Sequence, residues 1–372
     1  MKNVKEYLER GLENKKYLGY FQMSDFCEFD IYENKNRKVL VLHHTDLDGC
    51  GIVVLMEILK KIMNKHNGLN FNITYVPCPK EADSGLIDNL DKIDTFTDII
   101  ISDLSIKDKR LINKLDRMNN EGTNVVLLDH HESAIEMNKY TWACVLPHDI
   151  ENNKLYCGTS LSFWFFIPAI KKYMYNEIYL LTYEFMSLVS NWDTWNWKRT
   201  NNLGAKRLNN IFKYYGLETF VKTIVENITM RIKLLTDNEI TINKVLENTT
   251  ENICKKAMGN MRLNIKEING KEYCIGYIIT ESNVSDICDY IFDNCKDYKL
   301  DIIISYNIYF NSFSVRTRNN NVNAINIAKQ LVGSKDNGFG GHPAASGCSN
   351  SDLSNDILNK INDLIRNIDI LQ

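Results

Sequence analysis

Hydrophobic and polar positions follow one repeating pattern between Lys38 and about Thr200. Short runs rich in Val, Ile and Leu alternate with longer stretches in which apolar residues recur at helical spacing. Such runs predict buried strands, the longer stretches predict amphipathic helices, and their alternation is typical of βαβ units. The expected strands are residues 38–44, 71–77, 98–104, 124–130 and 141–146, and the expected helices are 50–66, 107–120, 159–174 and 177–190. We therefore predict an α/β fold for residues 38–203, with a doubly wound, mainly parallel sheet.

The rest of the chain divides into three segments. Residues 1–37 form a polar, partly aromatic N-terminal extension, with a short helix expected at 3–13. Residues 204–260 carry Leu, Ile, Lys, Glu and Asn at helical spacing and predict a helical connector. Residues 261–372 predict a smaller C-terminal α/β domain. Its expected elements are strands at 261–267 and 272–280 joined at Asn269-Gly270, a helix at 284–294, strands at 300–306 and 309–317, and a helix at 322–332.

Metal-binding residue types gather where the predicted strands end. The first strand leads into His43, His44, Asp46 and Asp48, the third into Asp103, and the fourth into Asp129, His130 and His131, while Asp193 adds a later acidic position. In open α/β sheets the ligand site lies beyond the carboxyl ends of the strands. Burying so many carboxylates and imidazoles together is unfavourable unless cations neutralise them. The sequence therefore predicts a hydrolytic site with two divalent metal ions.

The ligand types indicate which metal is expected. Asp46 and Asp48 follow a strand, and Gly49 is expected to permit a tight turn that aims both carboxylates at neighbouring cations. Mixed histidine and aspartate ligation favours Mn²⁺, with Mg²⁺ and Co²⁺ as alternatives. Asp103 is well placed to bridge two ions about 3.5–4 Å apart, and His130 and Asp193 would complete the second ion's ligands.

Most of these motifs, taken alone, could have a structural role instead of a role in metal binding. Asp46-Leu47-Asp48-Gly49 alone could be a solvated turn, Asp103 could cap the following helix, and Asp193 could pack in a loop. We favour packing over base stacking for Trp192, Trp195 and Trp197. A purely structural role is disfavoured for Asp129-His130-His131, because these residues make a poor hydrophobic core.

Taken in order, the motifs resemble those of the DHH phosphoesterases. The matching residues are Asp46-x-Asp48-Gly49, Asp103, Asp129-His130-His131 and Asp193, while Gly340-Gly341-His342 with Ala345-Ser346-Gly347 resembles the glycine-rich substrate loop of the DHHA1 subdomain. Within this family, His44-Thr45-Asp46-Leu47-Asp48-Gly49, Asp193-Thr194-Trp195 and Ala205-Lys206-Arg207-Leu208-Asn209 are most similar to bacterial nanoRNases, the oligoribonucleases of the NrnB type. The resemblance covers about residues 38–350.

The resemblance implies roles for individual residues. The implied metal ligands are His44, Asp46, Asp48, Asp103, His130 and Asp193. The assignment of His44 departs from many relatives, which place a histidine where this chain has Leu42. His131 would contact the scissile phosphate or protonate the leaving oxygen, and Asp129 would orient an imidazole. The implied substrate contacts are Arg316, Arg318, Gly340, Gly341 and His342, as arginine and a glycine-rich backbone suit phosphate.

The implied activity is metal-dependent hydrolysis of short oligoribonucleotides to mononucleotides from one end. In that mechanism a phosphodiester is held between the two domains, and domain closure gates entry. The alternatives are a phosphatase for 3′-phosphoadenosine 5′-phosphate, a phosphodiesterase for linear or cyclic dinucleotides, and a non-catalytic nucleotide sensor.

Composition bears on the length of the substrate, the state of the cysteines and the location of the protein. A net charge of −3 and the lack of a basic tract argue against binding long nucleic acids. Ten cysteines without a C-x-x-C pair predict reduced thiols, among them Cys50, Cys78, Cys144, Cys274 and Cys348. Neither a signal-peptide core nor an apolar run of about 18 residues is found, so a cytoplasmic protein without a membrane partner is expected. The sequence leaves monomer and homodimer open.

Overall fold

The computed structural model describes residues 4–5, 38–67, 72–79, 90–147, 156–170, 173–333, 338–350, 363 and 366–367. The chain forms two compact units, Met1–Asn243 and Lys244–Gln372. Their boundary falls within the segment that the sequence predicts to be a helical connector. The helix expected at 3–13 lies outside the described residues, apart from Val4 and Lys5, which are helical.

The first unit is built on a five-stranded parallel sheet with strand order β2-β1-β3-β4-β5. The strands are β1 (Lys38–His44), β2 (Asn72–Cys78), β3 (Asp98–Ser102), β4 (Asn124–Asp129) and β5 (Ala143–Val145). The helices are α2 (Leu47–Asn67), α4 (Lys109–Asn120), α5 (Gly158–Ile170), α6 (Asn176–Asp193), α7 (Asn196–Thr200) and α8 (Leu203–Thr229), with the 3-10 helices η3 (Leu90–Thr95) and η4 (Glu132–Lys139). The predicted α/β fold is confirmed.

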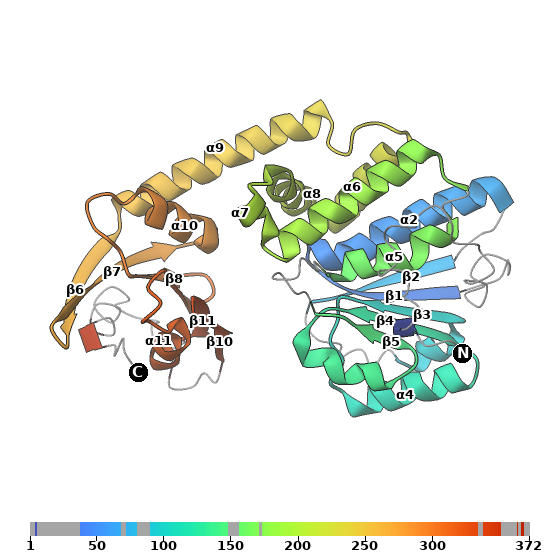
Figure 1. The fold of residues 1–372 in the computed structure, drawn as a ribbon, viewed down its shortest axis with the longest axis horizontal. Helices are drawn as coiled ribbons and strands as arrows, with labels where there is room; N and C mark the ends of the chain where they lie inside the picture. Colours follow the sequence, from blue (N-terminus) through green and yellow to red (C-terminus); the bar gives the residue numbers. More distant parts are fainter. Residues whose placement is uncertain are drawn as a thin grey trace. The chain divides into compact units, whose positions relative to one another are not determined.

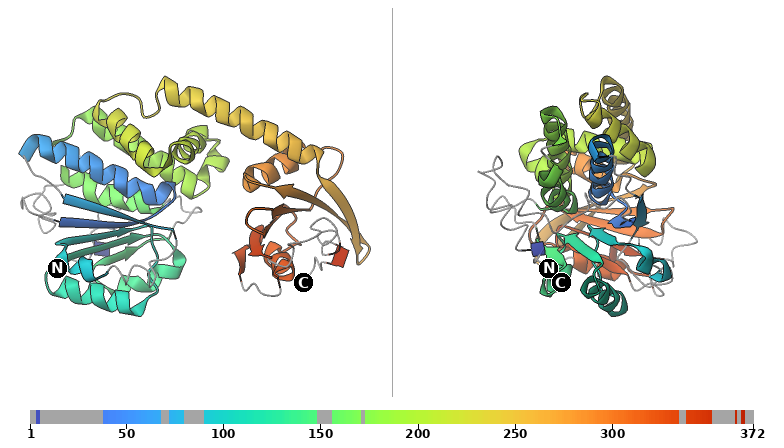
Figure 2. Two further views of the ribbon diagram at one scale, coloured as in Figure 1. Left: turned by 180° about the vertical axis from the view of Figure 1, so that it is seen from behind. Right: turned by 90° about the vertical axis from the view of Figure 1, so that its right-hand side faces the viewer.

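Helices cover both faces of this sheet. Helices α2, α5, α6 and α8 lie on one face and α4 on the other (Figure 1), and the views in Figure 2 show the same layers. Along β1, Val39 and Val41 pack into the core under α2, whereas Leu40 and Leu42 pack into the core under α4. Successive side chains of a strand point to opposite faces, so a strand covered on both sides is apolar throughout.

Helix α8 is part of the core of the first unit. Leu208, Ile211 and Phe220 are buried in the same apolar cluster as residues of α2 and α6. The helical periodicity of residues 204–260 correctly predicted α8 and α9 (Asp237–Gly259). It could not show which helix packs against which, because periodicity reports an apolar face and not its partner.

The second unit holds a six-stranded mixed sheet with strand order β10-β11-β9-β8-β7-β6. Its strands are β6 (Arg262–Ile268), β7 (Lys271–Thr280), β8 (Ile302–Asn307), β9 (Ser312–Thr317), β10 (Phe339–His342) and β11 (Ala345–Ser349), and its helices are α10 (Val284–Asn294) and α11 (Ala324–Leu331). Strands β7 and β8 are parallel and the other pairs antiparallel. The predicted hairpin at Asn269-Gly270 is confirmed, and both residues have the positive φ (52° and 75°) that such turns require.

The glycine-rich segment expected as a loop is instead a β-hairpin. Strands β10 and β11 pair antiparallel, with Gly341 opposite Ser346. Gly341 has a φ of 137°, and a Cβ there would lie 2.4 Å from the carbonyl oxygen of Ala345. Glycine, alanine and serine have low strand propensity, so the loop prediction was wrong because pairing with β9, and not local preference, extends these residues.

Two further expectations concern composition. The five named cysteines are free thiols, four of them buried and Cys274 half-buried. Among the described helices, none combines the length and apolar character that crossing a membrane requires.

Candidate metal centre

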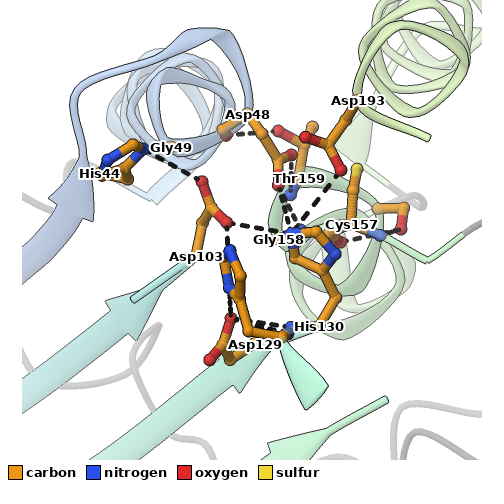
Figure 3. Close-up of polar contacts among 12 residues, drawn as sticks. His44, Asp48, Gly49, Asp103, Asp129, His130, Cys157, Gly158, Thr159 and Asp193 are labelled. Atoms are coloured by element: carbon orange, nitrogen blue, oxygen red, sulfur yellow. Dashed lines mark hydrogen bonds and ion pairs between the residues drawn. The ribbon is translucent and has the colours of Figure 1, made fainter. Parts of the chain in front are cut away.

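All six predicted metal ligands lie together at the carboxyl edge of the parallel sheet. Three overlapping groups form there, and within each group potential ligand atoms lie within 4.8 Å of one another. The groups are His44, Asp46 and Asp103; Asp48, His130 and Asp193; and Asp103, Asp129, His130 and His131. Figure 3 shows Asp48, Asp103 and Asp193 directed towards the imidazole of His130. The prediction that strand ends converge is therefore confirmed by the geometry.

Asp103 is shared between two of these groups. Its Oδ1 lies 3.2 Å from Nε2 of His130, and its Oδ2 lies 3.9 Å from Nδ1 of His44. The same Nε2 of His130 is 3.7 Å from Asp48 and 3.6 Å from Asp193, while His44 is 3.0 Å from Asp46. The two oxygens of one carboxylate thus face two separate sets of ligands.

The backbone of Asp103 is unusual. Strand β3 ends at Ser102, which pairs with Leu128 of β4, whereas β4 continues for one more residue to Asp129. Asp103 instead adopts a left-handed conformation with φ of 57°. Its N–H donates to the carbonyl of Leu128, which fixes it beside β4. The alternative of a helix cap is excluded, because Asp108 caps α4 by accepting from the N–H of Arg110. A non-glycine residue held in this conformation is a frequent feature of functional sites.

The N-terminus of α5 fixes Asp48. The carboxylate accepts the N–H groups of Gly158 at 2.6 Å and Thr159 at 2.8 Å, and the Thr159 hydroxyl donates to the Asp48 carbonyl at 2.7 Å. Sequence reasoning missed Gly158 and Thr159. The only local signal was a Gly-Thr-Ser run before an apolar stretch, which marks a helix start but does not reveal a partner about 110 residues away.

Gly49 does not form the turn that the sequence predicts. It lies inside α2, and a Cβ there would lie 2.3 Å from the carbonyl oxygen of His44. Its N–H donates to Oδ1 of Asp46, which therefore acts as a cap for α2. Asp46-Leu47-Asp48-Gly49 is thus a helix start, and the glycine is needed because the helix approaches the end of β1 closely.

The electrostatics of the cluster favour cation binding. Asp48, Asp103 and Asp129 are at most 3% exposed. Burial, followed by the negative charges of neighbouring aspartates, raises the pKa of Asp103 and of Asp193 well above the usual range. The buried Oδ2 of Asp193 accepts no hydrogen bond from the described residues. Carboxylate oxygens combined with imidazole nitrogens suit divalent metal ions, so the residues present fit such ions.

His131 is the more accessible histidine of the pair. Its Nδ1 lies 2.7 Å from Oδ1 of Asp129, and the side chain is 48% exposed. This hydrogen bond raises the pKa of His131. A cavity of about 220 Å³ opens beside it, lined by residues of the cluster together with Leu104, Ser105 and Ser133. The two serines were not found from the sequence, and Ser105 donates to Asp129.

The predicted substrate residues lie in the second unit. Arg316 on β9 is opposite Ala345 of the glycine hairpin, and its guanidinium donates to the carbonyls of Val315 and Ser346. His342 and the two glycines before it are exposed on β10. Arg318 is directed elsewhere, towards α10, where it pairs with Asp293 at 2.6 Å and Asp289 at 3.9 Å.

Comparisons with known proteins agree with this geometry. Residues 38–189 match the DHH family, N-terminal domain. This segment is a DHH domain. The chain is 27% identical over 314 residues to oligoribonuclease NrnB of Bacillus subtilis (strain 168), covering 83% of this chain and 72% of that protein.

A solved structure supports the fold. The chain resembles exonuclease RecJ bound to manganese with a TM-score of 0.51 and 12% identity, covering 95% of this chain and 97% of that one. The resemblance drawn from the motifs is confirmed: residues 38–189 match a DHH domain, the chain is similar to an oligoribonuclease, and the candidate ligands form a cluster suited to divalent metal ions, which together indicate a phosphoesterase.

Proposed function

We propose that the protein hydrolyses short oligoribonucleotides to mononucleotides with two divalent metal ions, Mn²⁺ being favoured. The observation that carries this is the position of Asp103, whose two carboxylate oxygens face the His44 and Asp46 group on one side and the His130 group on the other. The similarity to an oligoribonuclease supports RNA as the substrate class. Short substrates agree with a net charge of −3.

His44, Asp46, Asp48, Asp103, His130 and Asp193 would hold the two ions. When bound, two such ions neutralise phosphate charge and make water a stronger nucleophile at neutral pH. The protein contributes the rigidity of the ligands: the α5 N-terminus holds Asp48, and the Leu128 carbonyl holds the backbone of Asp103.

His131 is proposed to donate a proton to the leaving oxygen. Its Nδ1 is occupied by Asp129, so a protonated imidazole offers Nε2–H to the substrate. The neighbouring cavity gives this edge of the ring access to a phosphodiester. Asp129 acts by orienting the ring and by stabilising its positive charge, as outer partners of catalytic histidines do.

The glycine hairpin and Arg316 are the proposed phosphate-binding group of the second unit. Gly340 and Gly341 are exposed, and an anion can approach their backbone closely since no Cβ intervenes. Arg316 lies on β9, which pairs with the second strand of the same hairpin, and its guanidinium donates to the carbonyl of Ser346, the residue opposite Gly341. We do not include Arg318 among the phosphate-binding residues, because its guanidinium already pairs with two aspartates of α10.

The test is a comparison of substrates with Mn²⁺ present. Time courses would follow 5′-labelled RNA of two, five and twenty-four nucleotides, 3′-phosphoadenosine 5′-phosphate and cyclic di-AMP. The proposal predicts that the two shortest RNAs disappear first and that mononucleotides accumulate. Inert RNA with turnover of one of the small nucleotides would instead assign a phosphatase or a dinucleotide phosphodiesterase. Tight binding without turnover of any substrate would assign a nucleotide sensor.

A further inference from the structure

An exposed tryptophan lies in the turn that follows the candidate ligand Asp193. Trp195 is 58% exposed and adopts a left-handed backbone conformation with φ of 58°. Both features are unusual, because a large apolar ring gains free energy by burial and a bulky side chain disfavours positive φ. The packing role that the sequence predicted is therefore wrong for Trp195.

The two neighbouring tryptophans do pack. Trp192 and Trp197 are half-buried, and their rings stack with centroids 5.4 Å apart and an angle of 18°. Trp192 also lies against the main apolar core of the first unit. Trp195 alone of the three projects its indole, so the exposure is not a general property of this segment.

The conformation that exposes Trp195 is fixed by surrounding hydrogen bonds. The buried Thr194 bonds through both its N–H and its hydroxyl to the carbonyl of Ser190. The N–H of Trp195 donates to the carbonyl of Trp192, and its own carbonyl accepts from the N–H of Lys198. The turn between α6 and α7 is thus ordered, and the ring is presented from a defined backbone.

The position of the ring relates it to the proposed chemistry. Trp195 follows the candidate ligand Asp193 by two residues, so their Cα atoms are at most about 7.6 Å apart. The Nζ of Lys198 lies 4.6 Å from the Trp195 ring centroid. An exposed aromatic ring accompanied by a cation is the arrangement by which proteins hold single-stranded nucleic acids, since the ring stacks on a base and the cation attracts the phosphate.

We propose that Trp195, assisted by Lys198, is the stacking platform for a nucleobase of the RNA next to the scissile phosphate. This inference rests on the proposed function and makes Trp195 a positioning residue. It contacts a base and not the reacting atoms. The consequence is selectivity for phosphodiesters that carry a nucleobase, independent of base identity because every base presents a π-face.

The experiment combines a protein change with a substrate change. kcat and KM would be measured with Mn²⁺ for wild type, Trp195→Ala and Trp195→Phe, on an RNA pentamer and on the same pentamer with abasic riboses. Trp195→Ala should weaken kcat/KM on the normal pentamer by roughly 5- to 150-fold, the range expected for one stacked base. Trp195→Phe should retain most activity, and neither variant should change activity on the abasic pentamer.

Tyr175→Ala is the matched control. Tyr175 is a similarly exposed aromatic residue at the opposite end of α6 from Asp193, and its removal should leave both substrates unaffected. An equal loss on normal and abasic RNA would show that Trp195 only supports the fold. No loss on normal RNA would show that no base stacks there. Either result overturns the inference.

A binding readout separates this inference from the proposed function. Fluorescence anisotropy of the labelled pentamer would be followed in an Asp103→Asn background with and without Trp195→Ala. Loss of affinity for the normal but not the abasic pentamer would support the platform even if wild-type protein failed to cleave RNA. Equal affinities in the two proteins would contradict the platform even if cleavage were observed.

Discussion

At Asp103, a left-handed backbone and a buried carboxylate occur in the same residue. The side chain is 3% exposed and faces other aspartates, whose charges raise its pKa after the larger effect of burial. In the absence of a cation this arrangement destabilises the folded state, since a buried charge without compensation is unfavourable. We therefore expect Asp103 to lower the free energy of unfolding of the metal-free protein, a cost that is common at functional sites.

Asp103→Asn should stabilise the metal-free protein. The change removes a charge from the crowded cluster while keeping the shape of the side chain, and an increase in Tm of roughly 2–4 °C is expected, as for about 1 kcal/mol in a unit of this size. Calorimetry in EDTA would measure it. Asp108→Asn is the control, because asparagine caps a helix as well as aspartate does. An unchanged or lower Tm for Asp103→Asn would contradict the electrostatic account.

Asp129→Asn should lower kcat by about 10–100-fold, the usual effect of losing a partner that orients a catalytic histidine. The carboxylate accepts from Nδ1 of His131 and from the backbone N–H of His130. Asparagine can keep only a weaker, neutral version of these bonds. Steady-state kinetics on an RNA dinucleotide would check this, with circular dichroism to verify folding. Unchanged kcat would remove His131 and Asp129 from the proposed proton transfer.

At the scale of elements, the contact between α2 and α5 positions the candidate ligand Asp48. A Cβ at Gly51 of α2 would lie 1.7 Å from the hydroxyl oxygen of Thr159, the residue that holds Asp48. Gly51→Ala should therefore push the two helices apart, reduce stability by about 1–3 kcal/mol and lower activity. Denaturant unfolding and dinucleotide hydrolysis would measure the two effects.

Gly259→Ala is the control for this substitution. Gly259 ends α9, and a Cβ there meets no atom within 4 Å. Its replacement should be neutral or slightly stabilising, since alanine favours helix. If Gly51→Ala were equally harmless, the close approach of α2 to α5 would not be what fixes Asp48.

The elements themselves were largely predictable from the sequence, because periodicity is local. The run at 38–44 became β1 without change, and the helix predicted at 284–294 became α10. The site was only partly predictable. Its aspartates and histidines stand out at strand ends, but Gly158 and Ser105 enter through contacts between distant segments. The glycine hairpin was missed because pairing with β9 overrides weak local preference.

At the scale of the whole molecule, the two units should respond differently to metal. All the candidate ligands lie in the first unit, Met1–Asn243. The proposed function requires Mn²⁺ to bind the folded state of that unit, which should stabilise the unit by linkage, by about 2.7 kcal/mol at a concentration 100 times Kd. Hydrogen exchange should therefore slow in α2, β4 and α5 and stay unchanged in β7, β8 and β9. Protection of both units, or of neither, would contradict this assignment of the metal centre.

The most direct test of the central claim is the initial rate of hydrolysis of a 5′-labelled RNA dinucleotide by wild type and by His130→Ala, each with Mn²⁺ and with EDTA. His130 is decisive because its Nε2 lies within 3.7 Å of Asp48, Asp103 and Asp193. The account predicts rapid cleavage by wild type with Mn²⁺, none in EDTA, and none by a folded His130→Ala in either. Cleavage that persists in EDTA, or that survives the loss of His130, would contradict it.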